Sequence, residues 1–302
     1  MARQSKSAMS RALVRRETIS GYLFLLPSLI FFIGFVVIPM FICIFNSLTD
    51  ATMYDSGSFV GMKNFVDLWK DETFLEALKN TFVIVLVSVP TVCAFSLWVA
   101  SVIYKLNGKL LSTFRCIFYL PVVTGSVAVT VVWKWMYNNY YGVFNYVLKG
   151  IGVIDQNINW LGDSRFALWC IILILFTTSV GQPIVLYVSA LGNVDHSLVE
   201  AAQVDGATDF QVFWKIKWAQ MMPTTLYILV ITTINSFQCF ALIQLLTTGG
   251  SGTNTVMFYI YWTAFKLTEK TGHFGYANAM GVILAIFIGA LSALQFRLAR
   301  EK

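Results

Sequence analysis

The chain has 302 residues, 57% of them hydrophobic and only 12% charged, and its formal net charge is +6. Its mean hydropathy is +0.70, whereas about a quarter of the residues in an average soluble domain are charged. This composition excludes an ordinary soluble domain and indicates an integral membrane protein, and a charge of +6 needs no nucleic-acid partner to explain it.

Six apolar runs are long enough to cross a bilayer, because a spanning helix needs about 20 apolar residues and satisfies its own backbone in lipid. They cover residues 21–48, 81–104, 116–137, 166–190, 222–246 and 275–296. The first run is too long for a signal peptide and lacks a small-residue cleavage site, so we expect a retained span, kinked by Pro27 and Pro39. We predict an all-α, polytopic membrane protein with six transmembrane helices, formed by an N-terminal tail (1–20) and a transmembrane domain (21–302).

Lysine and arginine set the expected orientation, because short loops rich in these residues stay in the cytoplasm. With the N-terminus inside, the inner segments hold most of the basic residues, including Arg15, Arg16, Lys105, Lys215 and Lys217. In the outer segments, acidic residues outnumber basic ones. Both termini and the loop at 192–221 are therefore predicted to be cytoplasmic.

A short polar segment, LVEAAQVDGATDFQVF (198–213), separates the fourth and fifth runs. Two capping boxes predict two helices in it, and Gly206 is expected to take the positive φ that ends the first helix. The boxes pair Ser197 with Glu200 and Thr208 with Gln211. The spacing of Phe210, Phe213, Trp214 and Trp218 predicts one apolar stripe on the second helix.

An amphipathic connector on the membrane surface would explain this stripe and also Glu200. It does not explain the small residues Ala201, Ala202 and Gly206 on a turn that faces the cytoplasm. A small surface of this kind favours the close approach of a docking partner.

The sequence contains no chemistry of its own that would supply energy. It has no G-x-x-x-x-G-K-[ST] motif for nucleotide phosphates and no clustered catalytic side chains. The six runs contain no Asp or Glu, the usual relays of ion-coupled carriers, and Lys134 is expected to be an interface anchor. Five scattered cysteines without a C-x-x-C pair predict no metal site or disulfide. We predict no enzyme activity and no cofactor, so any energy must come from another subunit.

The polar segment resembles the EAA motif of ABC importer permeases, the cytoplasmic loop that docks into the ATPase subunit. The matching residues are Glu200, Ala201, Ala202, Asp205, Gly206, Ala207, Phe213 and Ile216. Ala219 departs from the family, which usually has a proline there, whereas Pro223 fits. FVGMKNF (59–65) and FALIQLLTTGG (240–250) are similar to segments of carbohydrate-uptake, maltose-type permeases, although Ser251 replaces the proline of the family's GGP.

The resemblance implies a transport subunit in a bacterial cytoplasmic (inner) membrane. Its implied partners are a second homologous permease subunit, two copies of a cytoplasmic ATPase, an extracytoplasmic solute-binding protein and membrane lipid, with a sugar as substrate. It also implies that Glu200, Ala201, Ala202, Asp205, Gly206 and Ala207 couple the permease to the ATPase.

Polar residues recur along the fifth run at helical spacing, namely Thr232, Asn235, Ser236 and Cys239. Such residues either bond helices together or line a pathway. Gln182, beside Pro183, is open to the same two interpretations. The resemblance places Thr232, Ser236, Cys239 and Gln182 at or near sugar-contacting positions of the family, and the absence of buried cations argues against a phosphorylated ligand.

Three alternatives remain open from the sequence alone. One is an ABC permease for another substrate, such as a peptide, an inorganic ion or a polyol phosphate. The second is an ion- or proton-coupled secondary carrier, which the carboxylate-free runs disfavour. The third is a membrane scaffold without a transport role, which the polar stripe disfavours.

Overall fold

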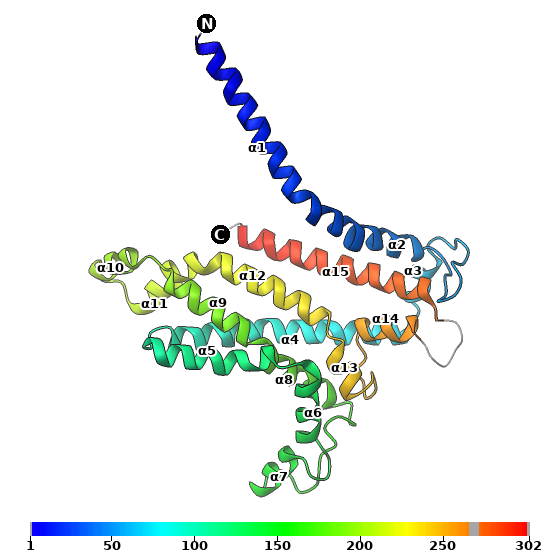
Figure 1. Cartoon of the computed structure of the whole chain (residues 1–302). Coiled ribbons are helices and arrows are strands. Elements are labelled where there is room, and N and C mark those ends of the chain that lie inside the picture. Colours follow the sequence, from blue (N-terminus) through cyan, green and yellow to red (C-terminus); the bar gives the residue numbers. More distant parts are fainter. Residues whose placement is uncertain (1, 266–271, 301–302) are drawn as a thin grey trace.

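The computed structural model describes residues 2–265 and 272–300, and every regular element among them is a helix. The long helices lie side by side as a bundle, with α1 (Ala2–Phe32) directed away from it (Figure 1). Four stretches are long and apolar enough to cross a membrane, and the number rises to six if each of two bent helix pairs is one span. The four are Arg15–Asn46, Glu72–Ile103, Asp209–Leu246 and Phe274–Leu298. The chain is therefore an all-helical, multi-pass membrane protein.

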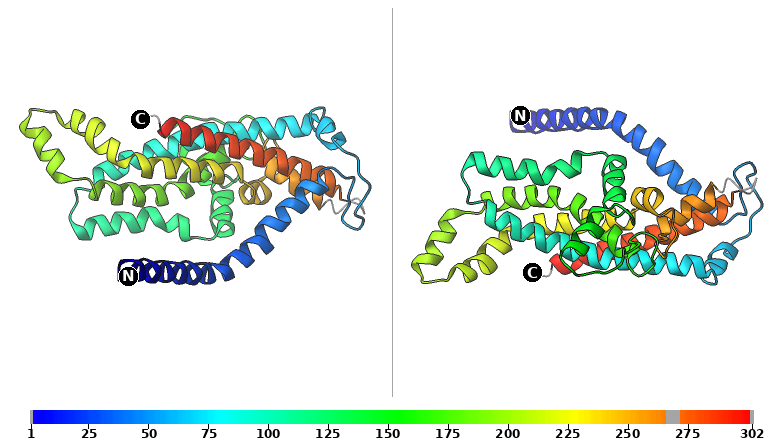
Figure 2. Two further views of the ribbon diagram at one scale, coloured as in Figure 1. Left: turned by 90° about the horizontal axis from the view of Figure 1, so that it is seen from above. Right: turned by 90° about the horizontal axis from the view of Figure 1, so that it is seen from below.

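The first span is helical throughout but irregular. A π-helical turn, η1 (Ile33–Val37), joins α1 to α2 (Ile38–Asn46) between the two prolines that were expected to kink it. Figure 1 shows the helix changing direction in this region. Both views in Figure 2 show α1 standing clear of the bundle, and its apolar window is 0% buried within the chain.

The run at 116–137 does not form one continuous helix, in contrast to the single span expected there. It is divided into α5 (Gly108–Val123) and α6 (Ser126–Met136), which meet at 93°. Thr124 and Gly125 have extended backbone between them. The fourth run is divided more gently into α8 (Ala167–Ser179) and α9 (Gly181–Gly192), at 41°.

The bundle is built around α4 (Glu72–Ile103), which packs against α9, α12 (Trp218–Phe237) and α8. In the N-terminal half of α4, Phe82 makes edge-on ring contacts with Phe237 of α12 and Phe287 of α15 (Phe274–Arg300), at centroid distances of 5.7 and 5.3 Å. Because lipid chains are as apolar as these side chains, such close packing and interhelical hydrogen bonds hold the helices together. One such bond runs from Gln295 Nε2 to Thr233 Oγ1, at 2.8 Å.

Shorter helices lie at the two ends of the bundle. At one end are α3 (Lys63–Leu68), α13 (Ala241–Leu246) and α14 (Val256–Ala264), and α7 (Val143–Gly150) follows α6. At the other end, α10 (His196–Val204), α11 (Asp209–Val212) and a second π-helical turn, η2 (Phe213–Lys217), lead into α12.

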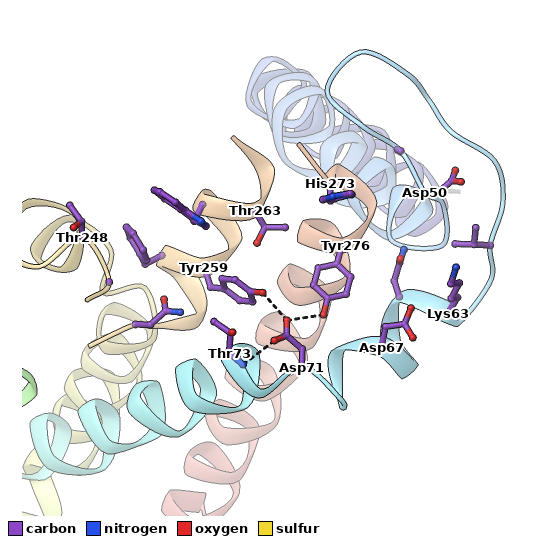
Figure 3. Close-up of a pocket in the computed structure, with 17 residues that line it drawn as sticks. Asp50, Lys63, Asp67, Asp71, Thr73, Thr248, Tyr259, Thr263, His273 and Tyr276 are labelled. Carbon is purple, nitrogen blue, oxygen red and sulfur yellow. Dashed lines mark hydrogen bonds between the residues drawn. The ribbon is translucent and has the colours of Figure 1, made fainter. Parts of the chain in front are cut away.

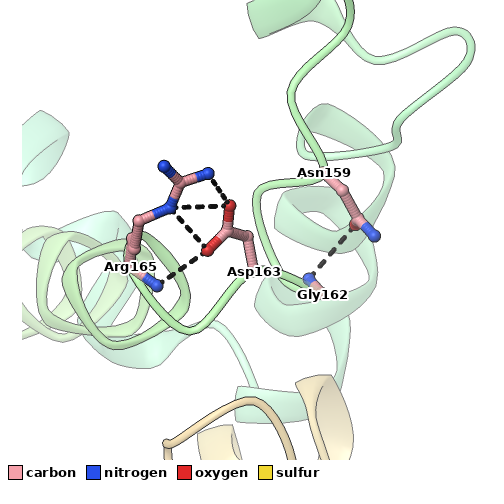
Figure 4. A network of polar contacts seen from close by, with 4 residues as sticks. All are labelled: Asn159, Gly162, Asp163 and Arg165. Atoms are coloured by element: carbon pink, nitrogen blue, oxygen red, sulfur yellow. Dashed lines mark hydrogen bonds and ion pairs between the residues drawn. The ribbon is translucent and has the colours of Figure 1, made fainter.

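Side-chain hydrogen bonds order the segment between α6 and α8. The buried amide of Asn145 accepts from Trp160 Nε1 at 3.0 Å and from the Ile158 amide at 3.2 Å, and it donates to the Ile158 carbonyl. Further along, Arg165 and Asp163 form an ion pair at 2.6 Å (Figure 4). The hydrogen bonds from Arg165 lower the pKa of Asp163 to about 2.

Candidate functional site

Asp195, and not Ser197, caps the first helix of the polar segment. Its carboxylate accepts hydrogen bonds from the Ser197 amide at 2.9 Å and the Ser197 hydroxyl at 2.7 Å. Both bonds lower the pKa of Asp195, and the bond from the hydroxyl has the larger effect. The predicted capping box of Ser197 with Glu200 is therefore wrong, because Asp195 places the start of α10 at His196.

The turn after α10 has the expected glycine geometry. Gly206 has φ of +81°, and its amide donates to the Gln203 carbonyl at 3.1 Å. The Ala207 amide donates to the Ala202 carbonyl at 2.9 Å, so the two bonds complete a Schellman motif. A Cβ atom at Gly206 would meet nothing within 4 Å, which shows that the turn is open to an approaching partner.

The second capping box is confirmed. Thr208 Oγ1 accepts from the Gln211 amide, and Gln211 Oε1 accepts from the Thr208 amide at 2.9 Å. The aromatic stripe continues from here, with ring centroids 6.1 Å apart for Phe210 and Trp214 and 5.3 Å apart for Trp214 and Trp218. The stripe passes through η2, and π-helical turns frequently occur at functional sites.

The predicted coupling residues gather on this projecting segment at one end of the bundle (Figure 1). Glu200, Ala201, Asp205 and Gly206 are exposed, whereas Ala202 and Ala207 are partly buried. Three exposed apolar side chains extend the surface beyond the residues singled out from the sequence, namely Leu198, Val204 (88% exposed) and Phe210 (72% exposed). An apolar and small-residue surface of this kind suits contact with another protein.

A second candidate site is a cavity of about 330 Å³ beside the break between α5 and α6. Asn235 and Cys239 line it, as the predicted pathway stripe would require. Thr232 and Ser236 of that stripe are only 4% and 2% exposed and lie outside the lining. Gln182 is partly buried and also lies outside it. Helix α12 ends at Phe237. The position of Cys239 is therefore set by the turn that follows the helix and not by helical periodicity.

The cavity brings together four polar residues that the sequence alone did not single out: Thr124, Ser126, Thr178 and Gln238. Interruptions in three helical runs meet around it, between α5 and α6, near the end of α8, and between α12 and α13. Helix α6 begins there at Ser126, and Gly125 before it provides no side-chain cap. Non-helical backbone at membrane depth is tolerated where it lines a water-filled cavity. The lining offers hydroxyls, amides and backbone groups but no charged side chain.

A close backbone contact fixes one wall of this region. A Cβ atom at Gly181 of α9 would lie 2.2 Å from the Phe118 carbonyl oxygen and 2.8 Å from Val122 Cγ2 of α5. Only glycine allows the two helices to approach this closely, as small residues do in membrane bundles generally.

A larger pocket of about 760 Å³ lies at the opposite end from α10, where α14 and α15 meet the segment before α4 (Figure 3). Asp71 caps α4 and also accepts hydrogen bonds from Tyr259 at 2.7 Å and Tyr276 at 3.0 Å. Partial burial alone would raise the pKa of Asp71, but these hydrogen bonds outweigh it and hold the pKa below its usual range. Asp71 therefore ties three helices together.

No cluster of three or more His, Cys, Asp or Glu side chains that could hold a metal ion occurs in the described parts of the chain. The five cysteines are free thiols. Cys239 is buried beside the cavity, and its carbonyl accepts a hydrogen bond from Thr255 at 3.1 Å.

Comparisons with known proteins agree with one another. A family described as "Binding-protein-dependent transport system inner membrane component" matches residues 17–301. The probable ABC transporter permease protein YesP of Bacillus subtilis is 33% identical over 290 residues, covering 94% of this chain and 91% of YesP. The lactose transport system permease protein LacF of Rhizobium radiobacter is 30% identical over 309 residues, covering 100% of each chain.

Among solved structures, a chain of a bacterial alginate ABC transporter is similar in fold. It was solved in complex with an alginate pentasaccharide-bound periplasmic protein. The TM-score is 0.80 at 25% identity, and the match covers 95% of this chain and 96% of that one.

Proposed function

Because this chain belongs to the binding-protein-dependent transport system inner membrane component family, we propose that it is the permease subunit of an ATP-driven importer for a sugar or oligosaccharide. The projecting segment around α10, with its open glycine turn, carries this proposal. The names of relatives support the sugar class, since LacF is a lactose permease and the similar structure is that of an alginate transporter. The permease hydrolyses no ATP itself, so the energy comes from a separate ATPase.

The proposed assembly contains a second homologous permease, two ATPase copies in the cytoplasm and a solute-binding protein outside. It has six spans, with α5–α6 and α8–α9 each forming one broken span and both termini inside. Residues 1–20 are the cytoplasmic tail, 21–302 the transmembrane domain and 192–221 the coupling loop. The basic residues at the α10 end of the bundle support this orientation. The unburied α1 supports a partner beside the chain.

Coupling proceeds through α12. Closure of the ATPase pair moves the docked α10, in which Glu200, Ala201, Ala202, Asp205, Gly206 and Ala207 form the contact. Helix α12 has 20 residues, or about 30 Å at 1.5 Å per residue, and connects η2 to the cavity residues Asn235 and Gln238. A rigid helix of this length transmits a movement of the loop to the cavity, as in other switching proteins.

The cavity binds a neutral saccharide in this proposal. Amides and hydroxyls match sugar hydroxyl groups as donors and acceptors, and an uncharged lining offers no counter-ion to a phosphate or carboxylate. Asn235 and Cys239 lie in the cavity wall, whereas Thr232, Ser236 and Gln182 support it from behind.

Replacing Ala201 with Trp tests the docking. The exposed side chain would place an indole on the contact surface, so we expect Ala201→Trp to abolish co-purification of the ATPase and uptake of sugar while the protein remains in the membrane. Gly150→Trp is a control, because Gly150 also has open space around it but lies in α7. Normal ATPase binding by Ala201→Trp would contradict the docking proposal.

Replacing Gln238 or Asn235 with Leu tests the cavity. Each change removes one hydrogen-bonding amide, and a net loss of about 0.5–1.5 kcal/mol corresponds to an uptake affinity lower by up to about tenfold. The measurement is uptake of labelled oligosaccharide in vesicles containing the assembled transporter. Ser236→Ala, which alters a buried side chain outside the lining, should leave uptake nearly unchanged. Equal affinities in all three variants would remove this cavity from the pathway.

A further inference from the structure

An apolar groove of about 460 Å³ lies between α4, η2, α12 and α15, which Figure 1 shows side by side. It lies on the same half of the bundle as the coupling loop. Pro90 and Leu97 of α4, Trp214 of η2, Trp218 and Leu226 of α12, and Leu298 of α15 form most of its wall. Its volume falls within the range of about 300–1,000 Å³ found for small-molecule sites.

The groove suits an apolar occupant, because most of the side chains in its wall are apolar and few polar atoms in it are free to bond. Thr225 donates to the Met221 carbonyl at 3.1 Å, and Tyr187 is only 1% exposed. Gln295 Nε2 donates to Thr233 Oγ1, and the Oε1 atom of Gln295, which has no partner, is itself buried. A sugar would find few free partners there, whereas a hydrocarbon chain needs none.

The depth of the groove corresponds to the hydrocarbon of one leaflet. The α4 residues in its wall, from Pro90 to Leu97, lie about 9 to 20 Å from the end of the helix at Ile103, at 1.5 Å per residue. On α12 the wall begins with the first residue, Trp218. Half of a hydrocarbon core of about 30 Å is about 15 Å thick, so the groove and one acyl chain cover the same depth.

The end of the groove nearest the coupling loop is positively charged. Lys215 follows Trp214, Lys217 precedes Trp218, and Arg297 precedes Leu298. Lys215 is exposed, and Lys217 donates to the Tyr104 hydroxyl at 2.8 Å and makes no ion pair. Between residues that the structure describes, the one ion pair joins Arg165 to Asp163, in the segment directly before α8. Among the residues that the structure describes, neither lysine therefore has a carboxylate counter-ion.

We propose that this groove binds one acyl chain of an anionic phospholipid from the adjacent leaflet, with the lipid phosphate against Lys215. The exposed indole of Trp214 lies at the level expected for aromatic side chains at the membrane interface. The lipid thereby occupies the joint between the coupling loop and α12. Anionic lipid then stabilises the same segment through which the docked loop moves the cavity.

Native mass spectrometry of the full-length chain tests the proposal. The chain is incubated in mild detergent with phosphatidylglycerol or with phosphatidylcholine carrying the same acyl chains, and the bound lipid is counted. We expect phosphatidylglycerol to be retained preferentially. Lys215→Gln should reduce this preference about fivefold, as the loss of one cation near an anionic surface predicts. Ala94→Trp, which fills the groove from an exposed position in its wall, should abolish retention of both lipids.

Two matched variants control for these changes. Lys79→Gln removes an exposed cation near the other end of α4, and Ala293→Trp adds an indole to an exposed position of α15 outside the groove; both should bind lipid like the unaltered chain. Equal retention of the two lipids, or full retention by Ala94→Trp, would overturn the proposal. A different result in the assembled transporter would also overturn it. This result is a disulfide between Leu226→Cys and the second permease subunit in a transporter that retains no lipid.

Discussion

Asp71 combines a helix cap with two tyrosine hydrogen bonds, and its function in the fold depends on its charge. Hydrogen bonds to a charged acceptor contribute about 1.5–3 kcal/mol, compared with about 0.5–1.5 kcal/mol for neutral pairs. Because the folded state lowers the pKa of Asp71, the ionised form is the one that stabilises the protein. This stabilisation is complete above the ordinary pKa of about 3.9 and is lost as the pH falls through the lowered pKa.

Asp71→Asn should therefore lower the thermal unfolding midpoint at pH 7, at a cost of about 1–2 kcal/mol for the weakened hydrogen bonds. The variant should also show a shallower loss of stability between pH 5 and about 3 than the unaltered protein. Thermal unfolding in detergent across this pH range measures both effects. Asp67→Asn changes another carboxylate of the same pocket and is the control. The same pH profile in both variants would contradict this function of Asp71.

At the scale of single elements, the start of α10 shows what sequence can and cannot decide. Asp and Ser are both favoured caps, and both precede the same helix at Asp195 and Ser197. The S-x-x-E spacing predicted the wrong capping residue. The Asp195 side chain reaches the Ser197 amide, and a sequence pattern does not show this geometry. The Thr208 and Gln211 box and the Gly206 turn had no competing residue, and both predictions are confirmed.

Asp195→Ala should fray the first turn of α10. Loss of a cap costs about 1 kcal/mol, so amide hydrogen exchange over 197–200 should accelerate about fivefold. Ser197→Ala should have a smaller effect, because the carboxylate of Asp195 still accepts from the Ser197 amide. Hydrogen exchange with mass spectrometry distinguishes the two variants. A larger effect for Ser197→Ala would restore Ser197 as the cap.

The helix breaks were harder to predict than the spans. Hydropathy finds apolar length, so it located the runs that became α4 and α15, but it does not detect a change of direction within an apolar run. Gly125 and Pro121 were visible signals in the third run, yet lipid-embedded helices often tolerate both residue types. The cavity is lined together by Thr124, Thr178 and Gln238, which are far apart in sequence, so no local pattern could identify it.

At the scale of the whole molecule, the two ends of the bundle differ in chemistry. One end has α10 with its exposed small and apolar residues, followed by Lys215 and Lys217. The other has the Asp71 pocket, and α7 follows α6 away from the bundle, with Tyr140 and Tyr146 more than four-fifths exposed nearby. Helix α1 adds an apolar surface that no other part of the described chain covers. A subunit of this form fits an assembly with different partners on each side of the membrane.

The proposed orientation predicts how cysteines at the two ends react. In a background without the five native cysteines, Tyr140→Cys should react with a membrane-impermeant maleimide added to intact cells. Gln203→Cys of α10 should react only after permeabilisation, because this exposed residue is cytoplasmic in the proposed orientation. Mass tagging on gels measures the labelling. Labelling of Gln203→Cys in intact cells would reverse the orientation.

The convergence of the helix breaks on one cavity also affects how its selectivity can change. Where helices are interrupted, the backbone itself presents N–H and C=O groups, and substitutions other than those to proline leave these groups in place. Side chains such as Asn235, Cys239 and Gln238 can be exchanged around this constant set of polar groups. Under the proposed function, a lineage of such proteins could therefore acquire new saccharides through a few side-chain replacements while the backbone groups around the cavity are inherited unchanged.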